Sequence, residues 1–137
     1  MKTTIDSRVI YITESDMKKL KPLLENANSR DDLRSLQAEL GMARVVAPAE
    51  VPPDVITMNS KARLRDCETG EEMVYTLAFP AQASIEQDRI SVLAPVGTAM
   101  LGHRVGDEFQ WNVPAGAVRL RVEEVLYQPE AAGDYHL

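Results

Sequence analysis

"LAPVGTAMLGHRVGDEFQWNVPAG", residues 93–116, contains four glycines and two prolines and decides which kind of fold this chain adopts. The glycines either form a loop that holds a phosphate group or serve as helix ends and turns. Gly97, Gly102 and Gly106 have four and then three residues between neighbours, which matches neither G-x-G-x-x-G nor G-x-x-x-x-G-K-[ST]. No lysine follows the last glycine, and no βαβ pattern surrounds the stretch. The spacing and the context therefore favour turns and helix ends.

The same stretch predicts a short helix between two strands. Pro95 fits the first turn of a helix, where its missing N–H costs nothing. Residues 96–102 then form one to two helical turns with apolar side chains that can pack on a sheet, and Gly102 ends them. Turns at "VGDEF" and "VPAGAV" direct the chain into the strands that follow.

The segments around this stretch alternate between apolar and polar residues, as half-buried strands do. In "KARLRD", Ala62 and Leu64 point to one side and the charged residues to the other. Gly70 supplies the permissive residue of the next hairpin turn. We predict a small antiparallel sheet. Its strands are residues 61–66, 73–79, 89–93, 108–113 and 117–127.

The N-terminal part predicts a short antiparallel helical hairpin of coiled-coil type. Residues 5–12 favour a short entry strand, and Thr13 is a candidate N-cap for the first helix. Pro22 predicts a kink or an early break in that helix. Asp31 and Asp32 lie near the hairpin tip, at the start of the second helix. The two apolar seams follow three-then-four spacing and consist of Met17, Leu20, Leu24, Leu33, Leu36 and Leu40.

Prolines divide the chain into two parts. "VVAPAEVPPD" holds three prolines within six residues, which predicts an extended, semi-rigid linker. We therefore assign residues 1–47 to the strand and hairpin, 48–53 to the linker and 54–137 to the sheet domain. The predicted fold class is α+β.

The composition excludes several classes of protein. The formal net charge of -6 argues against binding duplex DNA by phosphate neutralisation. One cysteine forms no internal disulfide, and no apolar run is long enough for a membrane span, so we expect a cytoplasmic protein. Cys67, His103 and His136 are scattered without zinc-ligand spacing, so we predict neither a metal site nor a cofactor.

The residues resemble a known family. "ISVLAPVGTAMLGHRVGDEFQWNVPAG", residues 90–116, resembles the C-terminal domain of the Gre transcript-cleavage factors, which implies an FKBP-like fold. "DVITMNSKARLRD", "APVGTAMLGHRVGD" and the C-terminal "YQPEAAGDY" are more similar to the regulators of nucleoside diphosphate kinase (Rnk), which are short relatives of the Gre factors. The likeness extends from about residue 52 to residue 135 and suggests that the C-terminal tail is docked.

The resemblance implies a non-enzymatic regulator that binds RNA polymerase. Gre factors place their C-terminal domain on the rim of the secondary channel and send a long coiled coil with an acidic tip to the active site. Here the first helix is at most residues 13–28, about 20 Å, and the acidic tip motif is absent. We therefore expect competition with Gre factors without stimulated cleavage, and an indirect influence on nucleoside diphosphate kinase. The candidate rim contacts are Ser91, Pro95, Val96 and Gly97, with Ala94 in place of the family's serine.

Other interpretations stay open at this point. Asp31 and Asp32 could offer hard oxygen ligands to Mg²⁺ for weak transcript cleavage, or could simply cap the second helix. An FKBP-like topology also admits a peptidyl-prolyl isomerase, and leucine seams could pair between chains in a dimeric adaptor. We expect a monomer that has no direct nucleic-acid specificity and no contact with a membrane.

Overall fold

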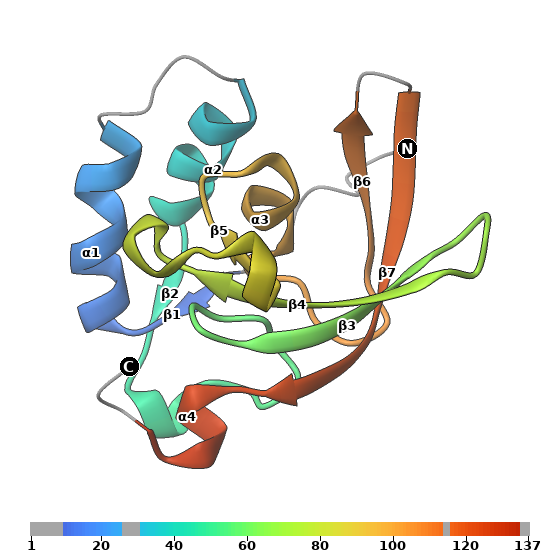
Figure 1. The fold of residues 1–137 in the computed structure, drawn as a ribbon. Helices are drawn as coiled ribbons and strands as arrows, with labels where there is room; N and C mark the ends of the chain where they lie inside the picture. Colours follow the sequence, from blue (N-terminus) through green and yellow to red (C-terminus); the bar gives the residue numbers. More distant parts are fainter. Residues whose placement is uncertain (1–9, 26–30, 114–115, 135–137) are drawn as a thin grey trace.

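The computed structural model describes residues 10–25, 31–113 and 116–134, and it confirms a mixed fold of helices and a largely antiparallel sheet (Figure 1). The finer features, a coiled-coil seam and an FKBP-like topology, stay predictions. The five-stranded sheet has the order β5-β4-β3-β7-β6. Its strands are β3 (Lys61–Asp66), β4 (Glu72–Ala78), β5 (Arg89–Ser91), β6 (Glu108–Val113) and β7 (Gly116–Tyr127).

One pair of strands departs from the predicted antiparallel sheet. β4 and β5 pair in parallel, with Thr76 opposite Arg89 and Ala78 opposite Ser91. Two parallel neighbours need a crossover connection, which carries the chain from the end of the first strand back to the edge of the sheet where that strand began. Residues 79–88 make that connection through two 3₁₀ turns, η3 (Pro80–Gln82) and η4 (Ile85–Gln87).

Two helices occupy the N-terminal part, as predicted. α1 (Glu14–Glu25) and α2 (Asp31–Leu40) lie side by side and run in opposite directions (Figure 1). Thr13 is the N-cap of α1, because its Oγ1 accepts a hydrogen bond of 3.3 Å from the backbone N–H of Asp16. The apolar seams are buried, as expected, at Met17, Leu20, Leu24, Leu33, Leu36 and Leu40.

Of the two effects predicted for Pro22, the early break is wrong, and the kink stays a prediction. α1 continues to Glu25, three residues past the proline. Proline leaves the carbonyl four residues earlier, that of Lys18, without its helical donor. Both Pro22 and Lys18 are exposed, so water can take the place of that donor and the helix persists.

A second, two-stranded sheet holds the two ends of the hairpin together. β1 (Tyr11–Ile12) pairs in parallel with β2 (Arg44–Val45). β1 is the described part of the predicted entry strand, whose residues 5–9 lie outside the described residues. The sequence offered no sign of β2, because a strand of two exposed residues carries no alternation.

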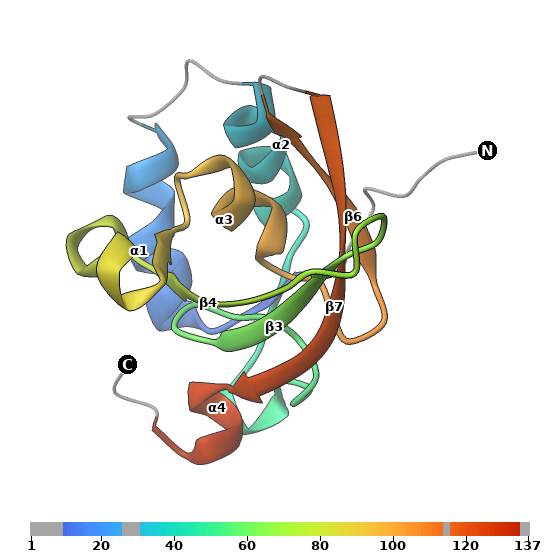
Figure 2. The same ribbon diagram turned by 45° about the vertical axis from the view of Figure 1, so that its right-hand side comes forward.

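The helices cover one face of the main sheet and share one core with it. α1, α2 and α3 (Pro95–Met100) lie on the same side of the sheet (Figures 1 and 2). The hairpin contributes Leu20 and Leu36, and the sheet contributes Leu64 and Leu120, all fully buried in a single cluster. The inward positions predicted for Ala62 and Leu64 are therefore confirmed.

The predicted extended linker is partly helical. Residues 48–50 form a 3₁₀ turn, η2 (Pro48–Glu50), because Pro48 occupies its first position, where no N–H is needed. η2 contacts α4 (Pro129–Ala132), the short helix near the C-terminus. Pro129 and Glu130 are buried, so this part of the tail is docked, whereas His136 lies outside the described residues.

Candidate functional site

The chain makes a tight turn between β5 and α3, and this turn carries the candidate contact residues. The Ser91 carbonyl accepts a hydrogen bond of 2.9 Å from the N–H of Ala94. The Ser91 hydroxyl accepts another, of 3.0 Å, from the N–H of Leu93. These two bonds explain why β5 ends at Ser91 rather than at Leu93, where the sequence had placed the end.

The first turn of α3 packs against the residues of this turn and fixes their conformation. A Cβ atom on Gly97 would lie 2.1 Å from the Ser91 carbonyl oxygen, which is far inside van der Waals contact. Only glycine therefore allows α3 to lie this close to the end of β5. Thr98 adds a hydrogen bond of 2.6 Å from its Oγ1 to the Val92 carbonyl. The turn is consequently well fixed.

The four candidate residues differ in exposure. Pro95 is exposed and Ser91 is half-buried, whereas Val96 and Gly97 are buried. Val96 and Gly97 can therefore position the turn but offer little surface to a partner. Leu93 and Ala94 are half-buried, and they join Pro95 at the surface, although the sequence analysis did not include either among the candidate contacts.

The acidic candidates Asp31 and Asp32 are the first two residues of α2. α2 begins at Asp31, where the sequence placed the start of the second helix. The side chains of Asp31 and Asp32 are outside the described residues. At 1.5 Å rise per residue, the 12 residues of α1 extend about 18 Å.

A buried carboxyl group at the start of α1 escaped the sequence analysis. Asp16 is 2% exposed, and its Oδ1 has no hydrogen-bond partner among the described residues. Burial and then the nearby carboxylate of Glu130 raise the pKa of Asp16 to about 6, against the attraction of Lys19. Glu130 itself accepts a hydrogen bond of 2.7 Å from the Thr57 hydroxyl. Residues far apart in the chain thus act on each other electrostatically.

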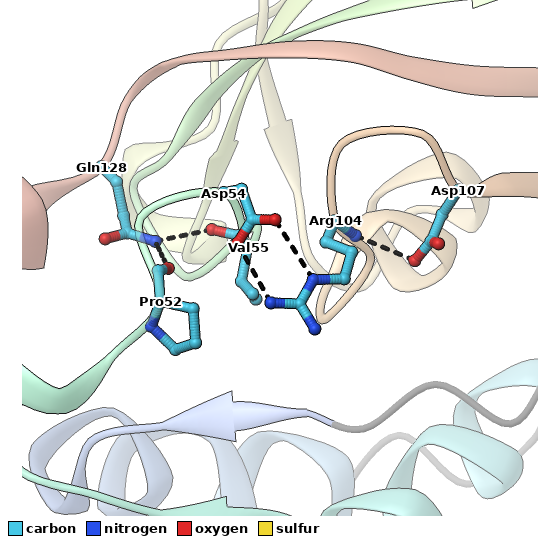
Figure 3. Close-up of polar contacts among 6 residues, drawn as sticks. All are labelled: Pro52, Asp54, Val55, Arg104, Asp107 and Gln128. Carbon is cyan, nitrogen blue, oxygen red and sulfur yellow. Dashed lines mark hydrogen bonds and ion pairs between the residues drawn. The ribbon is translucent and has the colours of Figure 1, made fainter.

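An ion pair joins the loop that contains Asp54 to the loop that contains Arg104. The guanidinium of Arg104 donates to both oxygens of Asp54, over 3.3 Å and 3.1 Å, and the Asp107 carboxylate accepts from the Arg104 N–H (Figure 3). Asp54 raises the pKa of Arg104 above its ordinary value. The groups are exposed, so this pair fixes loop geometry and contributes little net stability.

Gln128 anchors the C-terminal segment to the same loop. Its Nε2 donates to the carbonyls of Pro52 and Val55, over 2.8 Å and 2.7 Å (Figure 3). Its Oε1 accepts from the Ala131 N–H and so caps α4. Tyr127 donates to Asp134, which raises the pKa of Tyr127 to about 12. These bonds account for the docked tail.

Two of the three residues with soft ligand atoms, His103 and Cys67, lie within the described part of the chain. His103 is buried and stacks on Phe109 at 4.8 Å, with its Nδ1 2.6 Å from the Ala99 carbonyl oxygen, so it is part of the core. Cys67 is exposed in a turn. Within the described ranges, no group of three or more His, Cys, Asp or Glu is arranged to hold a metal ion. None of the helices described is long and apolar enough to cross a membrane.

These features define a small α+β protein whose candidate site is a fixed surface turn at the end of a sheet. Residues 51–127 match the family model of the GreA/GreB transcription elongation factor C-terminal region, and residues 8–46 match that of the Rnk N-terminus. The chain therefore belongs to the GreA/GreB family and combines its C-terminal region with an Rnk-type N-terminus. The division of the chain at residues 48–53 stays a prediction.

Three relatives show how far the likeness extends. The regulator of nucleoside diphosphate kinase from Escherichia coli (strain K12) is 50% identical over 104 residues, which are 75% of this chain and 76% of that protein. Transcription elongation factor GreA from Syntrophotalea carbinolica is 32% identical over 69% of this chain and 60% of that protein. A solved GreA/GreB structure from Nitrosomonas europaea has 43% identity and a TM-score of 0.76, covering 87% of this chain and 98% of that one.

Proposed function

We propose that this protein regulates transcription by binding RNA polymerase at its secondary channel, without catalysing a reaction. Membership of a family of transcription elongation factors supports this kind of partner. The observation that carries the proposal is the turn at Ser91–Pro95. Its backbone is fixed by Gly97 and Thr98, and it presents Pro95 on the surface. A fixed turn loses little conformational entropy on binding, which favours its use as a contact surface.

The short hairpin supports binding without stimulated cleavage. α1 is about 18 Å long. It therefore extends the hairpin tip a much shorter distance from the sheet than the long coiled coil that the family resemblance implies for Gre factors. Mg²⁺ ligands act only where they reach the reacting phosphate. A protein that occupies the channel with such a hairpin would exclude the longer factors, and the nucleoside diphosphate kinase would then be affected indirectly, through transcription.

A competition experiment with a surface variant tests this function. Core RNA polymerase is bound by the wild-type protein, and a Gre factor is added as competitor. We expect displacement by the Gre factor and no transcript cleavage with this protein alone. Pro95→Glu places a charge on the exposed turn while keeping a residue that suits a helix start, so we expect at least tenfold weaker binding.

Pro48→Glu is the matched control, because Pro48 also occupies the first position of a short helix but lies in η2, next to α4. We expect the control to bind as the wild type does. No binding at micromolar concentration would refute the proposed partner, and equal binding by both variants would refute the proposed surface. Cleavage of backtracked transcripts that is lost in an Asp31→Ala, Asp32→Ala double variant would show a cleavage factor instead.

A further inference from the structure

The face of the main sheet opposite the helices carries an unusual number of cations. Side chains alternate along each strand, and the register of the pairs shows which of them share this face. We define the basic face by its outward-pointing cations, which are Lys61, Arg63, Arg65, Arg89, Arg119 and Arg121. These are six of the fifteen Lys and Arg residues of a chain whose formal net charge is -6.

The basic face is assigned from the buried positions between these cations. Ala62 and Leu64 alternate with the β3 cations and are fully buried, and Leu120 and Val122 do the same in β7. Five of the six cations are exposed, and Arg63 is half-buried. None of the described helices α1, α2 and α3 lies on this side of the sheet (Figures 1 and 2).

Carboxylates neutralise only some of these cations. Arg63 pairs with Glu124 at 3.0 Å and approaches Glu72 at 3.9 Å. Arg119 and Arg121 approach Glu108 and Glu123 at 3.9 Å and 3.5 Å. Among the described residues, no ion pair is formed by the other three cations of the face. These are Lys61, Arg65 and Arg89.

An open depression lies where two of these three cations meet. Lys61 and Arg89 line it together with Val74 and Leu126, and Thr76, Gln87 and Asp88 complete its walls. Leu126 is 42% exposed, so it offers apolar surface in this depression. The depression thus places apolar surface directly beside positive charge.

We propose that the basic face binds an acidic protein segment, whose carboxylates meet Lys61, Arg65 and Arg89 and whose aliphatic side chain packs on Val74 and Leu126. The interspersed carboxylates Glu72, Glu108 and Glu124 disfavour a phosphate backbone, because it carries a negative charge at every nucleotide, whereas a peptide can place uncharged residues opposite these carboxylates. Charge and apolar surface together therefore fit a peptide better than a nucleic acid.

The size of the face sets the probe. Five strands at about 4.8 Å spacing span about 19 Å, and an extended peptide of about eight residues spans about 26 Å. We would use a fluorescently labelled peptide of this length composed of glutamate and leucine, and measure its binding to the full chain by anisotropy. NMR shift changes of the labelled protein would locate the contact.

The test variant is Lys61→Glu, Arg65→Glu, Arg89→Glu, which reverses the three cations that form no ion pair. We expect at least tenfold weaker peptide binding, and shift changes in the wild type confined to β3, β4, β5 and β7. The control is Lys18→Glu, Lys21→Glu, Arg44→Glu, which changes the net charge equally at exposed positions of α1 and β2. We expect the control to lose less than threefold.

Three results would overturn the proposal: equal loss in both triple variants, shift changes on α1 and α2, or tighter binding of a uridine oligonucleotide of equal charge. If the reversal prevents folding, the glutamine versions of the same three positions replace it, with the same expected direction. Pro95 belongs neither to the basic face nor to the depression, so Pro95→Glu should leave peptide binding unchanged. The two proposals can therefore fail independently.

Discussion

At the scale of single residues, the roles of two residues depend on tertiary contacts that no local sequence pattern reveals. Gly97 matters because the Ser91 carbonyl oxygen leaves no room for a Cβ atom. Asp16 looks like an ordinary first-turn carboxylate in the sequence, where it suits the helix dipole. In the structure Asp16 is buried near Glu130, so its negative charge opposes folding at neutral pH.

Replacing Asp16 should therefore stabilise the protein in a pH-dependent way. The folded-state pKa of about 6 lies above the ordinary 3.8, so the folded state binds the proton more tightly than the unfolded state does. Proton binding to Asp16 therefore favours the folded state. This contribution to the free energy of unfolding is fully present below about pH 4 and is lost as the pH rises through 6. We expect Asp16→Asn to raise the free energy of unfolding by about 1–3 kcal/mol at pH 8 and by little at pH 4.

Urea unfolding at pH 4, 6 and 8 measures this effect. Glu25→Gln is the control, since Glu25 is an exposed carboxylate at the other end of the same helix. We expect its stability to follow that of the wild type at each pH. An Asp16→Asn protein that is no more stable than the wild type at pH 8 would contradict the buried-charge argument.

At the scale of elements, the strands and helices follow from their periodicity, but their ends and partners do not. The sequence located α1, α2, α3 and all five strands of the main sheet to within a few residues. It missed the parallel pairing of β4 with β5, because the connection in residues 79–88 has no helical pattern that would mark a crossover. It missed β2 because two exposed residues carry no signal.

Pro22 gives a prediction at this scale. Because its ring is exposed and packs against little, Pro22→Ala should restore the helical hydrogen bond to the Lys18 carbonyl without losing core contacts. We expect the free energy of unfolding to rise by about 1–3 kcal/mol, as measured by urea unfolding.

Pro48→Ala serves as the comparison for Pro22→Ala. Pro48 stands at the first position of η2, where proline costs nothing, so its replacement should change stability by less than about 0.5 kcal/mol. Equal effects of the two changes would show that Pro22 does not interrupt α1.

The candidate site depends both on single residues and on how two elements pack. The family pattern indicated Ser91, Pro95, Val96 and Gly97 from their positions along the chain. Their exposures could not be predicted, because they depend on how closely α3 approaches the end of β5. The sequence also showed no sign of the basic face, since its cations come from three strands that the sheet brings together.

At the scale of the whole molecule, the hairpin and the sheet share one hydrophobic core. Leu36 of α2 is fully buried in the same cluster as Leu120 of β7, although the two lie far apart in the chain. Elements that share a core are expected to unfold together. Damage to the hairpin should then be felt in the sheet.

Leu36→Ala tests this coupling. Removing the buried side chain should lower the free energy of unfolding by about 2–5 kcal/mol. The fluorescence of Trp111, the single tryptophan, reports on the sheet part of the chain, and far-UV circular dichroism reports on the helices as well. We expect both signals to shift together in urea. Leu126→Ala, at an exposed position, should change stability by less than about 1 kcal/mol.

If the urea midpoint measured by Trp111 fluorescence is the same in Leu36→Ala as in the wild type, the shared core is contradicted. That result would instead show that residues 1–47 unfold independently of residues 54–137, as two separate domains do.

By itself, the sequence determined the α+β class, the helical hairpin, the turn residues and the family, because each depends on local spacing or on a short motif. Only the tertiary structure decided which strands pair in parallel, that Asp16 is buried near the charge of Glu130, that Gly97 lies against the Ser91 carbonyl and that six cations share one face. These features depend on contacts between residues distant in the chain. Their free energies arise only when the core forms and excludes water from one side of the sheet.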